Sequence, residues 1–347
     1  MKVAFFTYPD AFQNVGGGEI LLLKMREALQ IQGVMVDLFD PWVGRLENYD
    51  LIHVFGSVKD CLGLVRVARS RKVKIAITPL LWSDWRRAIF SDGSLRSKAD
   101  FMARHLAKVF FPAFPSKRRE LLLASDLVFP NSVIEKRHIA RLFAIPENKM
   151  RVVYNGVDPA FQDADPSLFK KIVGDGPFIL GVGRIEPRKN QLNLIKAVKG
   201  IRGARLILIG SPVSGYESYF ERCRKAGEGC AVFIPTLKHE DPLLKSAYAA
   251  CALFVLQGWF ETPGLVAMEA ALGGAKVLAT QGGSTKEYFG ETVEYLDPSN
   301  PFDIRKKITD ALSAPRSERL KARILENFTW DKVARDTLKF YEEALSR

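Results

Sequence analysis

The chain alternates short apolar runs of strand length with longer amphipathic stretches that suit helices. This pattern is typical of parallel sheets that carry helices on both faces. We therefore predict an α/β fold with two Rossmann-like doubly wound domains that face a central cleft. The predicted strands of the first half are Val3–Thr7, Val34–Phe39, Leu51–Phe55, Lys74–Thr78, Leu127–Pro130 and Arg151–Tyr154, and those of the second half are Phe178–Val182, Arg205–Ile209, Ala231–Ile234, Ala252–Leu256, Lys276–Ala279 and Val293–Leu296.

Two helices and a linker complete the predicted organisation. A helix over about Glu19–Gln30 follows the first strand, and a strongly amphipathic helix spans Trp330–Leu345. Residues 156–176 are rich in Asp, Pro and Gly and weak in periodicity, which predicts a linker. The length of 347 residues is about twice that of a typical domain. The predicted divisions are an N-terminal domain at 1–160, a C-terminal domain at 161–325 and a last helix at 326–347 that crosses back to the N-terminal domain.

The composition argues against several classes of protein. The four cysteines include no Cys-x-x-Cys pair, and the four histidines do not cluster near them, which indicates a reducing compartment and no structural zinc. The first apolar run is too short for the core of a signal peptide, and no run of ~20 apolar residues predicts a membrane span. We expect a cytoplasmic protein, or one that lies peripherally on the inner face of a membrane.

The net charge of +12 is concentrated in one stretch of the first half. Residues 66–119 hold fourteen Lys and Arg against three Asp, together with seven aromatic side chains. One interpretation is an ordinary solvated basic surface. The other is a surface over residues 82–119 that binds an anionic membrane or a phosphorylated acceptor, because aromatic and cationic side chains reinforce each other at a bilayer interface. Pro112 and Pro115 predict a short helix followed by an irregular loop there.

Three consecutive glycines, Gly16 to Gly18, separate the first predicted strand from the first predicted helix. Glycines allow backbone N–H groups to approach a phosphate closely, and the dipole of the following helix favours an anion. This signal is weak on its own, because glycine turns also occur there for packing reasons. The chain has no Gly-x-Gly-x-x-Gly or Gly-Lys-Ser/Thr motif, which disfavours a dehydrogenase or a P-loop enzyme.

A second motif, with Gly183, Arg184 and Lys189, follows the first predicted strand of the second half. Open α/β sheets bind ligands beyond the carboxyl ends of their strands, so both cations are expected to point into the cleft. Two cations suit a diphosphate, because they neutralise the charge that grows on a leaving nucleotide. A solvated turn rich in Arg and Lys is the alternative interpretation.

A third motif contains two glutamates, Glu261 and Glu269, on either side of a predicted helix start. The amides of Gly264, Leu265 and Val266 would form an uncapped helix N-terminus, which is an anion site. Glu269 would accept both hydroxyls of a ribose, as carboxylates do in nucleotide sites, and Glu261 would lie near a sugar. Pairs of glutamates at this spacing are common, whereas the ordered set of all three motifs is far more specific.

With these motifs the sequence resembles the retaining glycosyltransferases of the GT-B fold, glycosyltransferase family 4 (glycosyl transferases group 1), over nearly the whole chain. The matching segments are Gly16–Gly18, Asn155–Asp158, Gly183–Lys189, Glu261–Glu269, Gly282–Glu287 and the helix that begins at Trp330. The resemblance implies that Arg184 and Lys189 hold the diphosphate of a UDP-sugar or GDP-sugar. It implies that Glu269 binds the ribose. It also implies that Glu261 positions the sugar or supports the developing oxocarbenium charge.

The resemblance therefore implies a full set of functional residues and partners. The implied catalytic residues are Glu261, Arg184 and Lys189, and the implied donor-binding residues are Gly17, Gly18, Gly183, Arg184, Lys189, Gly264, Leu265, Val266 and Glu269. No cofactor and no metal is implied beyond the nucleotide-sugar donor. The N-terminal domain would bind a lipid-linked or polysaccharide acceptor in the synthesis of a cell-envelope glycan such as lipopolysaccharide. We expect no nucleic-acid partner.

One position departs from the family pattern. Many members carry a histidine, beside the transferred sugar, after the strand that corresponds to Lys74–Thr78, and here that stretch continues Pro79-Leu80-Leu81-Trp82. His53 matches an earlier family position that is usually structural. Two other functions stay open: a non-catalytic nucleotide-sugar-binding homologue, and a nucleotide-sugar epimerase of the same fold. The intact cation motif argues against the first, and no specific set of acid–base carboxylates supports the second.

Overall fold

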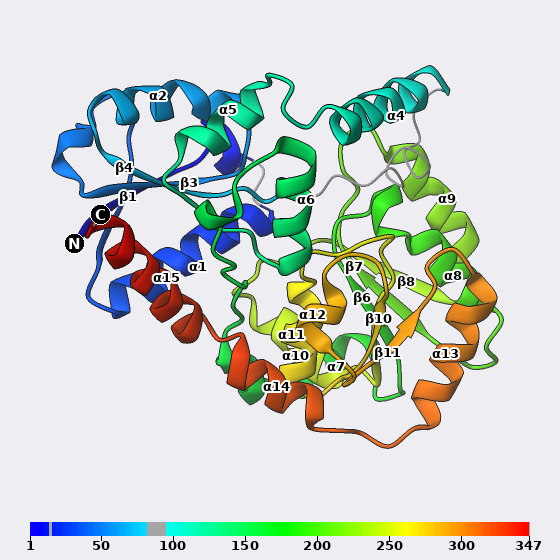
Figure 1. The fold of residues 1–347 in the computed structure, drawn as a ribbon. Coiled ribbons are helices and arrows are strands. Elements are labelled where there is room, and N and C mark those ends of the chain that lie inside the picture. Colours follow the sequence, from blue (N-terminus) through cyan, green and yellow to red (C-terminus); the bar gives the residue numbers. More distant parts are fainter. Residues whose placement is uncertain (14–15, 82–94, 347) are drawn as a thin grey trace. The chain divides into compact units, whose positions relative to one another are not determined.

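The computed structural model describes residues 1–13, 16–81 and 95–346 (Figure 1). The described chain divides into two compact units. Unit 1 is discontinuous in sequence, because it combines the N-terminal part up to Gly156 with Phe328–Arg347. Unit 2 consists of Val157–Asn327. Each unit is built on one parallel sheet with helices on both faces, which confirms the predicted pair of Rossmann-like domains.

The strands of unit 1 pair in parallel in the order β2-β1-β3-β4-β5. Their bounds are β1 (Lys2–Phe6), β2 (Met35–Leu38), β3 (Leu51–Phe55), β4 (Lys74–Thr78) and β5 (Leu127–Val128). Successive side chains of a strand point to opposite faces, so Val3 and Phe5 pack on one helix layer and Ala4 and Phe6 on the other. Buried apolar side chains of both layers thus enclose the sheet.

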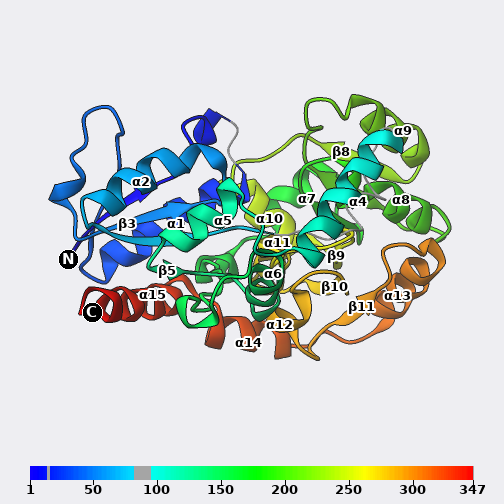
Figure 2. The same ribbon diagram turned by 45° about the horizontal axis from the view of Figure 1, so that its top comes forward.

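The two helix layers of unit 1 come from different parts of the chain. The first layer consists of α1 (Gly17–Ile31) and α15 (Trp330–Leu345), and the second of α2 (Leu62–Ser70), α5 (Lys117–Ala124) and α6 (Val133–Phe143). Figure 2 shows α2 and α5 side by side on one face of this unit. Short 3₁₀ turns lie between these elements: η1 (Ala11–Gln13), η2 (Leu46–Asn48), η3 (Lys59–Cys61) and η4 (Glu147–Lys149).

The helix α4 (Leu95–Phe110) contacts α6 and ends just before Pro112. It is longer than the short helix expected in this stretch, and residues 111–116 form the irregular connection to α5. Proline cannot continue a helix, because it lacks the backbone N–H and its ring clashes with the preceding turn.

The predicted strand Arg151–Tyr154 is not formed, and this prediction was wrong. The segment is extended and lies beside β5: the N–H of Arg151 donates to the carbonyl of Val128 at 3.0 Å, and the N–H of Val153 donates to that of Pro130 at 2.9 Å. Pro130 has no N–H with which to continue a ladder. The bounds of the other predicted strands agree with the structure within one or two residues.

The strands of unit 2 also pair in parallel, in the order β11-β10-β9-β6-β7-β8. Their bounds are β6 (Ile179–Val182), β7 (Leu206–Ile209), β8 (Ala231–Ile234), β9 (Leu253–Leu256), β10 (Lys276–Thr280) and β11 (Glu294–Leu296). Counted within the unit this is the order 6-5-4-1-2-3, which is that of the Rossmann dinucleotide-binding fold. The direction of winding therefore reverses between β6 and β9.

Helices cover both faces of this second sheet. The buried core of one face includes side chains from α8 (Gln191–Lys199), α9 (Glu217–Gly227) and α13 (Pro301–Ser313). The other helices contact one another in a second group, in which α11 also contacts β9 and β10. That group consists of α7 (Ser167–Val173), α10 (Pro242–Ala250), α11 (Leu265–Leu272), α12 (Thr285–Phe289) and α14 (Arg319–Asn327).

Except for Gly156, which belongs to unit 1, the predicted linker at 156–176 is a folded part of unit 2. It contains the 3₁₀ turn η5 (Pro159–Asp163) and α7, and α7 packs against α10. Phe161 and Phe169 of this segment are fully buried. The high content of Asp, Pro and Gly comes from turns and a helix cap, since Asp158 caps η5 by accepting from the N–H of Ala160 at 2.9 Å.

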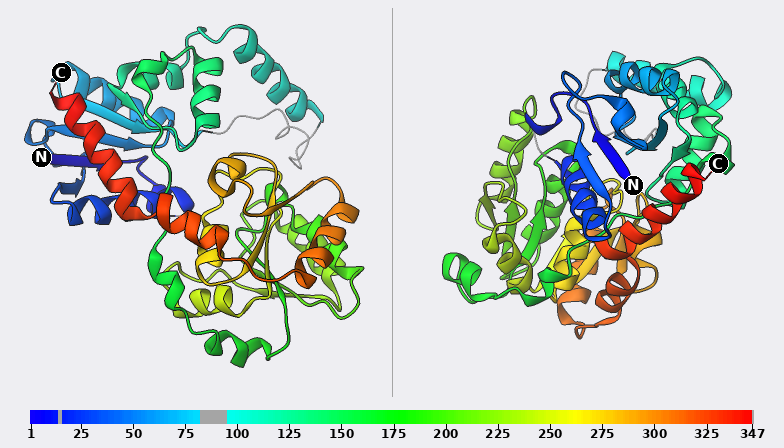
Figure 3. Two further views of the ribbon diagram at one scale, coloured as in Figure 1. Left: turned by 60° about the horizontal axis from the view of Figure 1, so that its bottom comes forward. Right: turned by 90° about the vertical axis from the view of Figure 1, so that its left-hand side faces the viewer.

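The chain returns to unit 1 through α15, which packs beside α1 (Figure 3). Trp330, Val333 and Tyr341 of α15 are buried in the same core as the α1 side chains. The ring of Trp330 lies directly against the backbone of Gly156, where an added Cβ would come within 2.6 Å of the indole. The motif around Gly156 therefore serves close packing at the point where unit 1 is completed.

This contact leads to a stability prediction. Gly156→Ala is expected to lower the free energy of unfolding of unit 1 by about 1–3 kcal/mol, because the methyl group overpacks the site against Trp330. Urea unfolding followed by fluorescence would measure the change. Gly63→Ala is the matched control: an added Cβ there meets nothing within 4 Å, and alanine favours the helix α2. Equal stability of the two variants would contradict the packing argument.

Candidate functional site

The loops after β6 and β9 in unit 2 have the topological position of a ligand site. Open α/β sheets bind ligands beyond the carboxyl ends of the strands where the winding reverses, which here is between β6 and β9. The loop after β6 carries Gly183 to Asn190 and the loop after β9 carries Gln257 to Gly264. These are the segments of the second and third sequence motifs.

Hydrogen bonds join the two loops to each other. The side-chain amide of Gln257 donates to the carbonyl of Lys189 at 2.9 Å, and that of Asn190 donates to the carbonyl of Gln257 at 3.2 Å. The indole N–H of Trp259 donates to the carbonyl of Pro187 at 3.1 Å. Asn190 has a positive φ of 57°, a conformation that asparagine tolerates better than most residues. The loops therefore form one fixed structure, and side chains on them are held in defined positions.

Lys189 and Glu261 meet across these loops as a buried ion pair. The Lys189 ammonium lies 2.8 and 2.9 Å from the two carboxylate oxygens of Glu261. The exposed fractions of the side chains are only 17% and 6%. Burial lowers the pKa of Lys189, an effect that the carboxylate of Glu261 opposes. The structure thus brings together two of the three residues predicted to be catalytic.

Arg184, the third of these residues, is more exposed to solvent than Lys189 and Glu261. Its side chain is 58% exposed, and its nearest acidic partner is Glu186, with 3.5 Å between guanidinium nitrogen and carboxylate oxygen. The same Glu186 oxygen pairs more closely with Arg188, at 2.9 Å. The guanidinium of Arg184 is therefore available to a ligand without the loss of a buried contact.

The N-terminus of α11 lies beside Glu261. Gly264 is its N-cap, with a φ of 93° and no side-chain cap. An added Cβ at Gly264 would lie 3.8 Å from the Glu261 Cβ and only 2.6 Å from the side chain of Leu256, so glycine is needed. The amides of Leu265 and Val266 have no intrahelical acceptor at this end of the helix. A helix N-terminus thus adjoins the buried ion pair.

The loop after β10 fixes the backbone of Glu261 from the other side. The N–H of Glu261 donates to the carbonyl of Gly282 at 3.1 Å, and the N–H of Ser284 donates to the carbonyl of Glu261 at 2.9 Å. Gly283 has a φ of 94°, and an added Cβ would lie 2.0 Å from the Glu261 carbonyl oxygen. An added Cβ at Gly282 would lie 2.2 Å from the Trp259 carbonyl oxygen, so both glycines of the Gly282–Glu287 motif are needed for close packing of the backbone.

Glu269 belongs to a second buried cluster on α11. One of its carboxylate oxygens lies 2.9 Å from Nε2 of His239, and the other accepts from the Tyr248 hydroxyl at 2.8 Å. Glu269 is 4% exposed and Tyr248 is fully buried. Phe161 contacts both partners edge-on, with ring centroids 5.6 Å from His239 and 5.8 Å from Tyr248. Sequence reasoning did not identify His239 or Tyr248, because neither belongs to a motif and only the fold brings them to Glu269.

Whereas the other candidate residues belong to unit 2, Gly17 and Gly18 belong to unit 1. They form the first turn of α1, where the carboxylate of Glu19 accepts from the N–H of Gly16 and from the Tyr8 hydroxyl, each at 2.8 Å. An added Cβ at Gly17 would meet nothing within 4 Å, whereas one at Gly18 would lie 3.2 Å from Leu80. Asn14 and Val15, just before this turn, lie outside the described residues.

Leu80 stands in the segment where the family resemblance led us to expect a histidine. It has a positive φ of 48° and is 38% exposed. The next N–H, of Leu81, donates to Glu135 at 2.5 Å. Burial raises the pKa of Glu135 to about 7. Trp82 and the rest of residues 82–94 lie outside the described residues, and so does the corresponding part of the predicted membrane surface.

His53 has a structural role. It is fully buried in β3, where its Nδ1 lies 2.5 Å from the Tyr341 hydroxyl and its Nε2 lies 2.8 Å from the Thr78 hydroxyl. Burial lowers its pKa to about 3, so the imidazole is neutral. The ring ties β3 to β4 and to α15 within unit 1.

No group of three or more His, Cys, Asp or Glu side chains with the arrangement of a metal site is present in residues 1–13, 16–81 and 95–346. Within the same ranges, every helix is too short or too polar to span a bilayer.

Models of known protein families match segments of both units. A model described as Glycosyltransferase Family 4 matches residues 41–161, and one described as Glycosyl transferases group 1 matches residues 167–327. A curated D-inositol 3-phosphate glycosyltransferase from Stackebrandtia nassauensis is 30% identical over 66% of this chain and 56% of its own length. The chain spans a little over half the length of this relative and of two others that match it.

Solved structures resemble the whole described fold. Sucrose-phosphate synthase from Thermosynechococcus elongatus has a TM-score of 0.77 at 18% identity, with 99% of each chain covered. HepE from Anabaena in complex with UDP-glucose has a TM-score of 0.73 at 18% identity, with 99% of this chain and 100% of that chain covered. At such low identity these likenesses show a shared fold.

Proposed function

We propose that this chain, which belongs to the glycosyl transferases group 1 (glycosyltransferase family 4) with the GT-B fold, transfers a sugar from a nucleotide-diphosphate donor with retention of the anomeric configuration. The observation that carries the proposal is the buried pair of Lys189 with Glu261 beside the N-terminus of α11. A cation and a helix N-terminus together suit a diphosphate, because both favour negative charge. The switch-point position in a Rossmann-ordered sheet supports a nucleotide as the rest of the ligand.

In this proposal unit 2 holds the donor. Arg184, Lys189 and the amides at Gly264 to Val266 bind the diphosphate, Gly183 allows its close approach, and Glu269 accepts the ribose hydroxyls. An ammonium group has three N–H donors, so Lys189 can keep its two contacts with Glu261 and offer the third to a phosphate oxygen. Glu261 then lies where the sugar joins the diphosphate.

The reaction exchanges one bond at the anomeric carbon for another. The acceptor oxygen attacks from the face that the nucleotide leaves, the bond between this carbon and the diphosphate oxygen breaks, and that departing oxygen takes the acceptor proton. A protein base is then unnecessary. The rate comes from stabilisation of the leaving diphosphate by Arg184, Lys189 and the α11 amides, without a metal ion. Each such contact typically contributes ~3 kcal/mol.

We propose a UDP-sugar or GDP-sugar as donor and a lipid-linked or polysaccharide acceptor of the cell envelope, bound by unit 1. Anabaena HepE, of the same fold, was crystallised with UDP-glucose, which supports a nucleotide sugar here. The cationic surface of unit 1 supports an acceptor that carries phosphate, because acceptors linked to lipid diphosphates are anionic.

The cluster around Glu269 gives a prediction about donor affinity. Tyr248→Phe and His239→Asn each remove a hydrogen bond to a buried carboxylate, an interaction typically worth ~1.5–3 kcal/mol. Each variant is therefore expected to raise the donor KM about tenfold with little change in kcat. Steady-state kinetics with varied donor would measure both constants. Tyr295→Phe, which removes a hydrogen bond to the carbonyl of Gly290, is the control, and a similar KM in all three variants would contradict the role of the cluster.

One assay separates the proposed function from its alternatives. The purified protein would be incubated with radiolabelled UDP-sugars and GDP-sugars, with and without membrane lipid extract. We expect equal amounts of nucleoside diphosphate and glycosylated product, formed only when acceptor is present. Donor binding, seen as a higher melting temperature, without turnover would indicate a non-catalytic homologue. An altered sugar without transfer would indicate an epimerase.

A further inference from the structure

Unit 1 exposes a cluster of large aromatic side chains outside the candidate donor site. Phe110, Phe111 and Phe114 are 71%, 68% and 73% exposed, at the end of α4 and in the turn that follows. This turn is ordered, since the N–H of Phe114 donates to the carbonyl of Phe111 at 3.0 Å. Three such side chains in five consecutive residues form an exposed apolar patch, which marks an interaction site more often than chance exposure.

Positive charge surrounds these aromatic side chains. The exposed Arg104 of α4 precedes Phe111 by seven residues, and the N–H of Phe111 still donates to the carbonyl of Ala107 at 2.8 Å, so both residues lie on one side of this end of the helix. Burial and the neighbouring charges of Arg118 and Arg104 lower the pKa of Lys108, so cations are crowded at this end of α4. On the other side of the aromatic turn, the exposed Lys117 begins α5.

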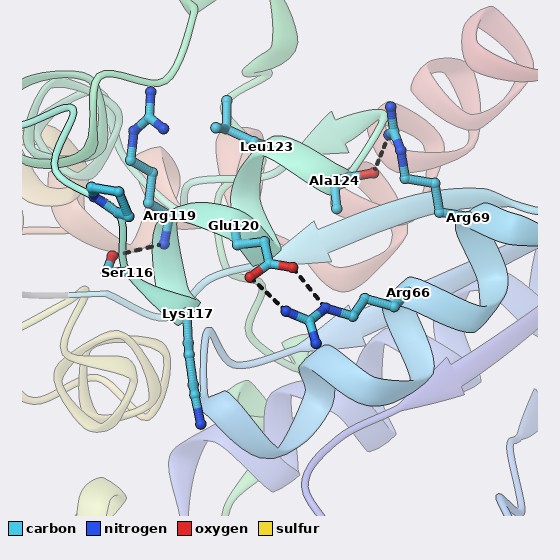
Figure 4. A pocket seen from close by; sticks show the side chains of 9 residues that line it. Arg66, Arg69, Ser116, Lys117, Arg119, Glu120, Leu123 and Ala124 are labelled. Carbon is cyan, nitrogen blue, oxygen red and sulfur yellow. Dashed lines mark hydrogen bonds and ion pairs between the residues drawn. The ribbon is translucent and has the colours of Figure 1, made fainter.

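The cationic surface continues into a cavity of about 640 Å³ directly after Phe114 (Figure 4). Pro115, Ser116 and Lys117 line this cavity together with Arg66 and Arg69 of α2. Arg66 forms two hydrogen bonds to Glu120, at 2.7 and 2.9 Å, so its charge is largely compensated. Arg69 donates to the carbonyl of Ala124 at 2.9 Å, which leaves its positive charge uncompensated by that contact.

Two cations of this stretch serve the fold instead. Arg118 donates to the carbonyl of Ser57 at 2.8 Å, and Arg119 donates to that of Phe143 at 2.9 Å, and both side chains are partly buried. The exposed set, which we call the basic aromatic face, consists of Arg69, Arg104, Phe110, Phe111, Phe114 and Lys117.

We propose that the basic aromatic face docks on the surface of an anionic lipid bilayer. Aromatic side chains bind most favourably at the boundary between headgroups and acyl chains, and cations beside them are attracted by anionic headgroups. An apolar protein surface would cover the aromatic side chains, and nucleic acid would neutralise the cations. An anionic bilayer does both. The proposal concerns a surface of unit 1 and does not depend on the catalytic assignment of unit 2.

Vesicle sedimentation tests the proposal with the full chain. The vesicles are phosphatidylcholine alone, or equal parts of phosphatidylcholine and phosphatidylglycerol. The charge variant is Arg104→Glu/Lys117→Glu, and the aromatic variant is Phe110→Ser/Phe111→Ser/Phe114→Ser. The matched control is Lys225→Glu/Lys339→Glu, which makes the same change in net charge at exposed positions of α9 and α15. Circular dichroism confirms that each variant is folded.

We expect the wild type and the control to bind only the vesicles with phosphatidylglycerol, with an affinity that falls steeply as salt is added. A cation near an anionic bilayer is worth about fivefold in affinity, so the charge variant should bind at least ~25-fold more weakly. The aromatic variant should also lose binding. Wild-type binding that does not need phosphatidylglycerol, equal binding by wild type and charge variant, or an equal loss in the control would overturn the proposal. So would binding to duplex DNA that is as tight as to vesicles and unaffected in the aromatic variant.

Discussion

Removal of either cation of the proposed donor site should slow transfer about a hundredfold while the protein stays folded. In Arg184→Ala and Lys189→Ala, one contact to the leaving diphosphate is lost, and such contacts act mainly in the transition state, so kcat falls. A hundredfold loss corresponds to ~2.7 kcal/mol of barrier. Single-turnover kinetics with saturating donor would measure it, with Lys225→Ala as the control for an exposed cation in the same unit. Unchanged rates in both variants would refute the assignment.

The buried ion pair requires a second control for Lys189. Its removal leaves the carboxylate of Glu261 buried without a partner, which destabilises the protein whatever the function of the lysine. The double variant Lys189→Met/Glu261→Gln removes both charges and should recover much of the lost stability. If the double variant turns over as fast as Glu261→Gln alone, Lys189 acts only by holding Glu261. If its stability recovers and it is still much slower than Glu261→Gln, Lys189 acts on the substrate.

The two glutamates should differ in the kinetic constant that they change. Glu269→Gln removes the charge that we propose to bind the ribose, an interaction present equally in ground and transition states, and should raise the donor KM ten- to a hundredfold. Glu261→Gln should mainly lower kcat, by about a hundredfold, because it weakens the support of positive charge on the sugar. Steady-state kinetics with varied donor would measure both constants for each variant. The opposite pattern would mean that the two roles are reversed.

Most strands were predictable because they are short, mainly apolar runs, such as Leu253–Leu256, and the pattern of a buried parallel strand can be recognised without tertiary information. The segment Arg151–Tyr154 has the same composition, but whether it pairs depends on the chain beside it, where Pro130 ends the ladder. The folded segment 157–176 was predicted as a linker because its turns and caps use the residue types of flexible chain.

The candidate site, like the fold, could be predicted from the sequence only in part. Spacing along the chain singled out Arg184, Lys189, Glu261 and Glu269, because helix starts and strand ends have local signatures. It did not reveal that Lys189 pairs with Glu261, 72 residues away, nor that His239 and Tyr248 hold Glu269. Such pairings are set by the order of strands in the sheet, and sequence periodicity does not encode that order.

The discontinuity of unit 1 has a consequence for synthesis on the ribosome. All of Val157–Asn327 leaves the ribosome before α15, so unit 2 can acquire its complete core first. Unit 1 cannot, because the α1 side of its sheet stays uncovered until Trp330 to Tyr341 have left the exit tunnel. During that interval Leu21, Leu22 and Met25 have no α15 to pack against. The nascent first unit should therefore be the part of the molecule that most needs a chaperone.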